Sequence, residues 1–174
     1  MLRIMAVFAC LTLMGVGVVH VVQAETVAVS RMSLMTFETD ATINAPAAKV
    51  WTSLTDADKA MSWCPLWKSA KDPQPLTKVG NTITFVDDWQ NVGKSVVIFV
   101  DPNKELRLAH VPDDGSYVCQ LRVVLTPAEG GTRVHVTEQY SDALDAPTDK
   151  DTAAKTQAEI AGYVAALKAA AEKK

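Results

Sequence analysis

The feature that constrains the fold most is a series of short, strand-like segments in the second half of the chain. The segments are rich in Val, Ile, Leu, Phe and Tyr, and the stretches NVGK, DPNK, PDDG and PAEGG separate them. Such β-branched, aliphatic and aromatic residues favour strands, whereas Gly, Pro, Asn and Asp favour turns. The short spacing therefore predicts an antiparallel meander of strands joined by hairpins. Its five strands are expected within residues 81–90, 95–100, 105–111, 116–126 and 132–141.

Two short helices are predicted before this meander. Asn44 is of a residue type that caps helix N-termini, and a first short helix is expected after it. Thr55 or Asp56 repeats the start signal for a second helix. Because Pro65 disfavours a helical conformation in the residue before it, the second helix should end near Cys64.

A first strand and a last helix complete the expected order. The alternation of residues 33–44 indicates a strand, and residues 152–174 are typical of one long helix. An apolar stripe at helical spacing runs along that helix and comprises Ile160, Tyr163, Val164, Leu167 and Ala171. A sheet has to bury one face, and this helix is its obvious cover. The sequence thus predicts an α+β fold.

The N-terminus has the pattern of a secretory signal peptide. Arg3 is followed by an apolar run over residues 4–22, and Val-Gln-Ala, ending at Ala24, is a small-residue cleavage pattern. The run is also long enough for an uncleaved membrane anchor, which is the alternative. We expect removal of residues 1–24 and export, to the periplasm, of a single domain formed by residues 25–174.

Charge and missing motifs exclude several classes of function. Loss of Arg3 changes the formal charge from −3 to −4, and the chain has no run of five basic residues, so nucleic-acid binding is not expected. The chain has no Ser-His-Asp order, phosphate-binding glycine loop or dinucleotide fingerprint. We therefore expect no cofactor. A membrane contact is expected only through the signal segment, if it stays uncleaved.

Alternation within the predicted strands assigns polar residues to the face under the helix. With the apolar side of each strand turned inward, Asp87, His110 and Glu138 also point to the helix, unless the register slips by one residue. The helix is rich in alanine, so its covering face is thin. Two arrangements stay open. One is a closely packed core, and the other is a cavity that admits small molecules and carries polar groups on its wall.

The cysteines allow two interpretations. In an exported protein, Cys64 and Cys119 are candidates for one disulfide, but Cys119 suits an ordinary core position equally well. A metal site is not expected, because His110, His135 and the two cysteines are widely spaced along the chain. His135 is also predicted to face outward.

Tryptophans gather around one of these cysteines, in the stretch SWCPLWK. Trp63 and Trp67 either close the core or line the entrance to a ligand site. In the second case, Trp89 would add flat surface for an aromatic or lipid-like molecule.

The sequence resembles the START-related helix-grip (SRPBCC) superfamily, in particular its polyketide cyclase and heat-shock-ATPase-activator-homologue branch. The similarity lies in INAPAAKVW at residues 43–51, in Trp63, in the Gly-Gly-Thr turn at residues 130–132 and in the long last helix. It implies a curved antiparallel sheet wrapped around the C-terminal helix, two short helices after the first strand, and an apolar cavity. It implies no single activity, because the superfamily includes lipid carriers, cyclases, dehydratases, hormone receptors and chaperone cofactors.

We expect an exported domain that binds a small lipid-like or aromatic molecule between sheet and helix. The expected ligand-binding residues are the aromatic and inward-facing polar ones, namely Trp63, Trp67, Phe85, Trp89, His110, Tyr117, Glu138 and Tyr163. One alternative is an enzyme of the cyclase or dehydratase type, in which His110, paired with Asp87 or Glu138, moves a proton on a bound enol or ketone. Another is an accessory protein of a periplasmic complex, which would bind a protein partner.

Overall fold

The computed structural model of the chain describes residues 34–64, 67, 70–86, 92–115, 117–142 and 150–173. The predicted signal peptide lies outside these residues, as do Asp87 and Trp89. Residues Arg31–Lys174 form one compact unit. Among the described helices, none combines the length and the apolar character needed to span a bilayer.

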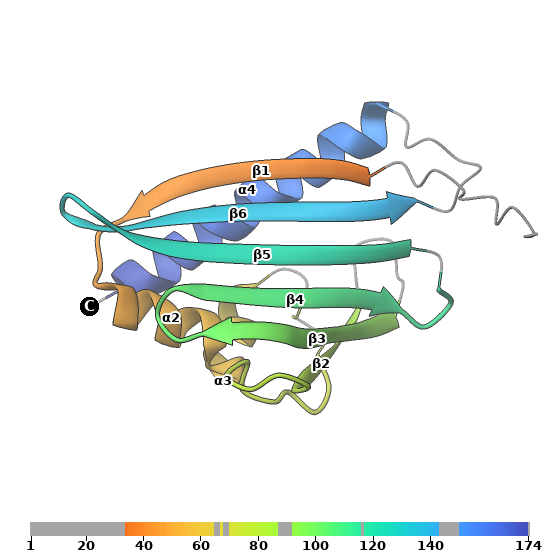
Figure 1. Cartoon of the computed structure of the whole chain (residues 1–174), viewed down its shortest axis with the longest axis horizontal. Helices are drawn as coiled ribbons and strands as arrows, with labels where there is room; N and C mark the ends of the chain where they lie inside the picture. The colour runs from red at the N-terminus through yellow and green to blue at the C-terminus, as the bar shows by residue number, and fades with distance from the viewer. Residues whose placement is uncertain are drawn as a thin grey trace, which may run out of the picture. The chain divides into compact units, whose positions relative to one another are not determined.

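Six antiparallel strands form one sheet, with the spatial order β1-β6-β5-β4-β3-β2 (Figure 1). Strands β2 to β6 are neighbours in chain order, and β1 joins on the far side of β6. The predicted meander is therefore confirmed. The strand bounds are β1 (Leu34–Ile43), β2 (Thr82–Val86), β3 (Val92–Asp101), β4 (Glu105–Pro112), β5 (Tyr117–Ala128) and β6 (Gly131–Asp142).

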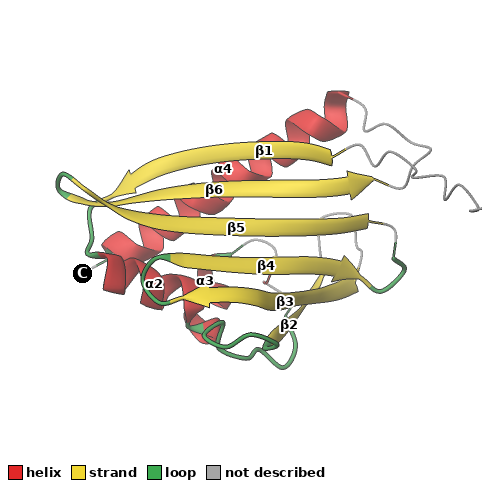
Figure 2. Ribbon diagram, in the orientation of Figure 1, coloured by secondary structure: helices red, strands yellow, loops and turns green. Residues whose placement is uncertain are grey.

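The three helices of the described residues lie on one side of this sheet, drawn in red behind the yellow strands in Figure 2. They are α2 (Ala47–Thr55), α3 (Ala57–Trp63) and α4 (Lys150–Glu172). Helix α4 packs along β1, and α2 and α3 pack against α4. The stripe predicted for the last helix is buried at every position, from Ile160 to Ala171. The expected cover of the sheet is thus confirmed.

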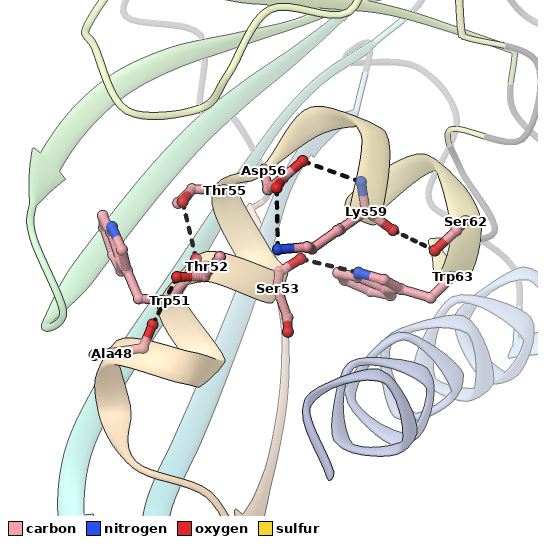
Figure 3. A network of polar contacts seen from close by, with 9 residues as sticks. All are labelled: Ala48, Trp51, Thr52, Ser53, Thr55, Asp56, Lys59, Ser62 and Trp63. Carbon is pink, nitrogen blue, oxygen red and sulfur yellow. Dashed lines mark hydrogen bonds and ion pairs between the residues drawn. The ribbon is translucent and has the colours of Figure 1, made fainter. Parts of the chain in front are cut away.

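One helix cap was predicted correctly and the other was not. The Asp56 carboxylate accepts from the backbone N–H of Lys59, which caps α3 as expected (Figure 3). Helix α2 instead has Pro46 at its N-cap position and no side-chain cap, so the assignment of Asn44 as the cap is wrong. The backbone N–H of Asn44 donates to Glu172 Oε1 at 2.7 Å, which ties the end of α4 to the segment between β1 and α2.

The prediction of a turn over the whole stretch NVGK is wrong, because Val92, Gly93 and Lys94 belong to β3. Glycine serves there for close packing. A Cβ atom on Gly93 would lie 2.4 Å from the carbonyl oxygen of Val111 and 2.7 Å from the ring of Phe85. Gly in a strand often marks such an approach of backbone or ring, which the turn interpretation missed.

The core lies between the inner face of the sheet and the helices. Its apolar side chains come from every strand and helix and include the fully buried Leu106, Leu108, Val123 and Leu167. Burial alternates along β4 and β5, as the period of a strand requires. The same alternation places several polar side chains inside, and these form the candidate site.

Candidate functional site

A row of polar side chains crosses the inner face of the sheet from β3 to β6. The strand register pairs Ser95 with His110, His110 with Cys119, and Cys119 with Tyr140. Glu138 lies two residues before Tyr140, so its side chain is on the same face and diagonal to Cys119. Four of the five are buried, and Tyr140 is half-buried. We call these five residues the polar row.

The imidazole of His110 is held from one side only. Trp67 Nε1–H donates to Ser95 Oγ at 3.2 Å, and Ser95 Oγ lies 2.7 Å from His110 Nδ1. The ring of Phe85 meets the imidazole edge-on, with centroids 5.9 Å apart. The other ring nitrogen, Nε2, is buried and has no hydrogen-bond partner among the described residues. Burial lowers the pKa of His110 to about 4, so the ring is neutral near pH 7.

The carboxylate of Glu138 is the acceptor at the other end of the row. Cys119 Sγ–H donates to Glu138 Oε1 at 3.0 Å, and the Tyr140 hydroxyl donates to the same oxygen at 3.3 Å. Burial raises the pKa of Glu138 to about 6, and the charge of Glu159 on α4 adds to this rise. Burial, followed by the charge of Glu138, also raises the pKa of the Cys119 thiol.

Three of these side chains form a compact set of metal-ligand types. One ligand atom each from His110, Cys119 and Glu138 lies within 4.8 Å of the others, and all three residues are buried. A metal site was not expected from the sequence, because His110, His135 and the two cysteines are widely spaced along the chain. Strand pairing removes that spacing, since it puts β4, β5 and β6 side by side. His135 stays out of the set, and its Nε2 contacts Thr137 Oγ1.

Helix α4 presents a second buried polar group to the interior. The hydroxyl of Tyr163 has no hydrogen-bond partner among the described residues. Trp63 meets the ring of Tyr163 edge-on, with centroids 5.1 Å apart. Burial raises the pKa of Tyr163, and Cys64 and Glu138 contribute electrostatically. The Tyr163 side chain is part of the core between α4 and the sheet.

The two tryptophans of SWCPLWK differ in position. Trp67 is fully buried, and it belongs to the core and to the hydrogen bonds of His110. Trp63 is half-buried, and its Nε1–H donates to the backbone carbonyl of Ser53 at 3.0 Å (Figure 3). That bond fastens the end of α3 to α2. Trp89 lies outside the described residues.

The candidate disulfide is not formed, because Cys64 and Cys119 are both buried thiols. Cys64 follows the last residue of α3 as its C-cap, so the helix ends where it was expected. Cys119 lies within β5 and directs its thiol to Glu138. The alternative interpretation, an interior position for Cys119, describes the structure.

The His–carboxylate pair of the enzyme hypothesis is not hydrogen-bonded in the described part of the chain. His110 pairs with Ser95, and Glu138 accepts from Cys119 and Tyr140. Asp87, the other expected partner, is outside the described residues. The arrangement provides a neutral imidazole nitrogen, a thiol and a carboxyl group that face a common interior point.

Tyr117 lies at the Tyr140 end of the polar row, whereas a surface cleft lies apart from the row. Tyr117 is half-buried, with its ring 5.8 Å from that of Tyr140. The cleft has a volume of about 590 Å³ and lies beside the junction of α2 and α3. Its lining combines both helices with the segment before β2: Trp51, Thr52, Thr55, Asp56, Ala57, Asp58, Pro73, Pro75 and Thr77. No residue of the polar row lines it.

Ser95 and the thiol of Cys119 were not among the expected binding residues. Alternation in β3 turns Ser95 to the same side as the buried Val97, which is a signal present in the sequence. The pairing of Cys119 with Glu138 depends on the register between β5 and β6. No local pattern reveals that register.

Comparison with solved structures shows the same fold in several proteins. Ara h 8.0201 has a TM-score of 0.64 at 16% identity, over 80% of this chain and 98% of that chain. Aha1 from Colwellia psychrerythraea has a TM-score of 0.59 at 22% identity, over 79% of this chain and 96% of that chain. Protein MLL2253 from Mesorhizobium loti has a TM-score of 0.61 at 20% identity, over 78% of this chain and 96% of that chain. At these identities the likeness concerns the fold alone.

The helix-grip fold expected from the sequence is thereby confirmed. No curated protein matches the chain. A family model described as "Polyketide cyclase / dehydrase and lipid transport" matches residues 35–172, which include every described strand and helix except the first residue of β1. The chain therefore belongs to the polyketide cyclase / dehydrase and lipid transport family.

Proposed function

We propose that this protein binds a small lipid-like or aromatic molecule between the inner face of the sheet and α4. The observation that carries the proposal is a pair of buried polar atoms, His110 Nε2 on β4 and Tyr163 Oη on α4, which have no partner among the described residues. A buried polar group without a hydrogen bond costs about 1–3 kcal/mol, and folded proteins rarely contain one. A bound molecule that places a hydrogen-bonding group at either atom would remove that cost.

The surroundings suit the apolar part of such a molecule. Phe85, Leu108 and Leu121 are buried on the same face as the polar row, and Trp63 and Tyr163 bring two aromatic rings from the helices. Ligand sites commonly combine apolar walls with a few convergent polar groups. The description of the family, which includes lipid transport, agrees with this class of ligand.

Fluorescence titration tests the proposal. Mature protein stripped of bound lipid is titrated with anilinonaphthalene sulfonate, an aromatic anion whose emission rises in apolar sites. Saturable binding of one dye per chain, displaced by palmitate, is the expected result. Tyr163→Phe should weaken palmitate binding by about 10-fold, which corresponds to one hydrogen bond. A titration without saturation would overturn the proposal.

A matched histidine pair controls for indirect effects. His110→Gln removes the inward-facing imidazole and should also weaken palmitate binding. His135→Gln changes a half-buried imidazole outside the polar row, next to Thr137, and should leave binding unchanged. Equal losses in both variants would contradict the assignment of the site.

We also propose that the domain acts outside the cytoplasm after cleavage behind Ala24. The apolar run and the Val-Gln-Ala pattern of the N-terminus support this. The intact mass of the protein isolated from the cell envelope tests it. A chain beginning at Glu25 is expected, and a full-length chain in the soluble cytoplasmic fraction would contradict it.

A further inference from the structure

We propose that His110, Cys119 and Glu138 bind a divalent transition-metal ion of the zinc class on the inner face of the sheet. The ligand atoms would be His110 Nε2, Cys119 Sγ and a carboxylate oxygen of Glu138. The inference goes beyond the proposed function but uses the same His110 atom, so the experiment below separates the two.

The geometry of the three side chains fits a tetrahedral ion. Zinc binds Cys, His and carboxylate ligands at about 2.0–2.3 Å, which separates the ligand atoms by about 3.3–3.7 Å. One ligand atom from each residue already lies within 4.8 Å of the other two, and Cys119 Sγ is 3.0 Å from Glu138 Oε1. Side-chain shifts of about 1 Å or less therefore complete the site.

The hydrogen bonds around His110 prepare it as a ligand. A metal-binding imidazole usually donates its second ring N–H to a fixed acceptor, which sets tautomer and orientation. Ser95 Oγ is in that position, 2.7 Å from Nδ1, and Trp67 holds Ser95 in turn. When Nδ1–H donates to Ser95, Nε2 carries the lone pair. The buried Nε2 has no other partner among the described residues, which is independent evidence for a ligand there.

A divalent cation balances the charge that its own ligands acquire on binding. Ligation requires the thiolate of Cys119 and the carboxylate of Glu138, so that the thiol proton leaves to solvent when the ion binds. The thiolate and the carboxylate would then be two buried negative charges side by side. A divalent ion compensates this negative charge. Tyr140, which donates to Glu138, orients the carboxylate from outside the set.

The ligand types select the class of ion. A thiolate and an imidazole suit zinc, cobalt and related ions, whereas magnesium and calcium prefer oxygen ligands only. Three protein ligands leave a fourth position open, as in zinc sites that bind a water or a substrate group. In the helix-grip interior, that position would be available to the polar end of the bound molecule.

Titration with Co²⁺ alone, without any organic ligand, tests the metal site. The mature protein is kept reduced and titrated while its visible and near-ultraviolet absorption is recorded. One equivalent should produce the spectrum of a tetrahedral site together with a thiolate-to-cobalt band, and Zn²⁺ should displace the cobalt. A spectrum without the thiolate band, or without saturation at one equivalent, would overturn the proposal.

Matched variants identify the ligands. Cys119→Ser should abolish the thiolate band and lower zinc affinity more than about 100-fold, which exceeds the usual effect of an outer-shell change. Cys64→Ser, which changes the other buried thiol, should retain the thiolate band and the zinc affinity. His110→Gln should lose affinity like Cys119→Ser, and His135→Gln should not. Retained affinity in Cys119→Ser, or equal losses at the two cysteines, would contradict the assignment.

Two further measurements keep the outcomes distinct. Glu138→Gln is nearly isosteric, so it removes the anionic ligand even if a cysteine variant fails to fold, and it too should bind zinc more than about 100-fold more weakly than the wild-type chain. Unchanged zinc affinity in this variant would count against the site. Dye binding to metal-free protein reports the proposed function separately. A chain that binds dye and palmitate but no cobalt would overturn the metal site alone.

Discussion

Ser95 and His110 lie directly opposite each other on β3 and β4, with Ser95 Oγ 2.7 Å from His110 Nδ1. Trp67 donates to the same hydroxyl, so one serine connects a buried indole to a buried imidazole. This connection fixes one side of the His110 ring and leaves Nε2 directed at the interior. The orientation of the His110 ring therefore depends on Ser95.

Ser95→Ala should destabilise the fold by about 1–3 kcal/mol, because the Trp67 indole N–H and His110 Nδ1 lose their common buried partner. Urea unfolding followed by circular dichroism measures the change. Ser62→Ala is the matched control, since the exposed Ser62 hydroxyl donates only to the carbonyl of Lys59. It should change stability by less than about 0.5 kcal/mol. Equal effects of the two variants would contradict the role given to Ser95.

Gly93→Ala and Gly162→Ala should shift stability in opposite directions. At Gly93 the new methyl group would meet the backbone of Val111 and Pro112 at 2.4 and 2.6 Å, and backbone cannot move aside as a flexible side chain can. We expect a loss of about 1–3 kcal/mol from overpacking. At Gly162, within α4, no atom outside the neighbouring helix backbone lies within 4 Å of the added methyl group. Alanine should therefore stabilise the helix by about 0.5–1 kcal/mol. Thermal unfolding of both variants checks the signs.

Strand alternation was sufficient to place several residues of the site. The inward positions of His110 and Glu138 and the buried stripe of α4, with Tyr163, follow from periods of 2 and 3.6 residues. The same reasoning missed the cluster of His110, Cys119 and Glu138, because convergence across three strands depends on register. Hairpin geometry and packing set the register, and neither is visible in a single segment.

The errors in the local assignments also have physical causes. Asn44 is a good cap by type, but its backbone N–H is held by Glu172 from α4, and the helix begins after Pro46. Gly93 suits a turn by type, but it lies in β3 because only glycine fits between Phe85 and Val111. In both cases a contact with a segment distant in sequence prevailed over local preference.

Tyr163→Phe should leave the ligand-free protein equally stable or up to about 1 kcal/mol more stable. The substitution removes only a buried hydroxyl that has no partner among the described residues. Together with the weaker palmitate binding expected above, this separates a binding group from a structural one. A destabilisation above about 1 kcal/mol in chemical unfolding would show that the hydroxyl supports the fold.

Glu105 should contribute to stability at neutral pH and lose this contribution in acid. Hydrogen bonds from Arg122, then Arg107, hold the pKa of Glu105 down to about 2, from an ordinary value of 4.5. The contribution is therefore complete above about pH 4.5 and disappears as pH falls towards 2. Because both arginines are more than a third exposed, we expect only about 1 kcal/mol.

Unfolding of Glu105→Gln measured from pH 7 to pH 2 tests this contribution. The stability difference from the wild-type chain should be largest at neutral pH and should vanish in acid. Arg122→Gln removes the principal partner, and in the double variant the two losses should not add. A difference that stays constant with pH would contradict the ion-pair account.

Native mass spectrometry of the mature protein, purified without detergent from the cells that produce it, tests the central claim of interior binding most directly. We predict a population of chains that carries one additional lipid-like or aromatic molecule, released on denaturation and diminished in Tyr163→Phe. Wild-type protein that shows only the bare chain, and that takes up no palmitate after purification, would contradict the claim.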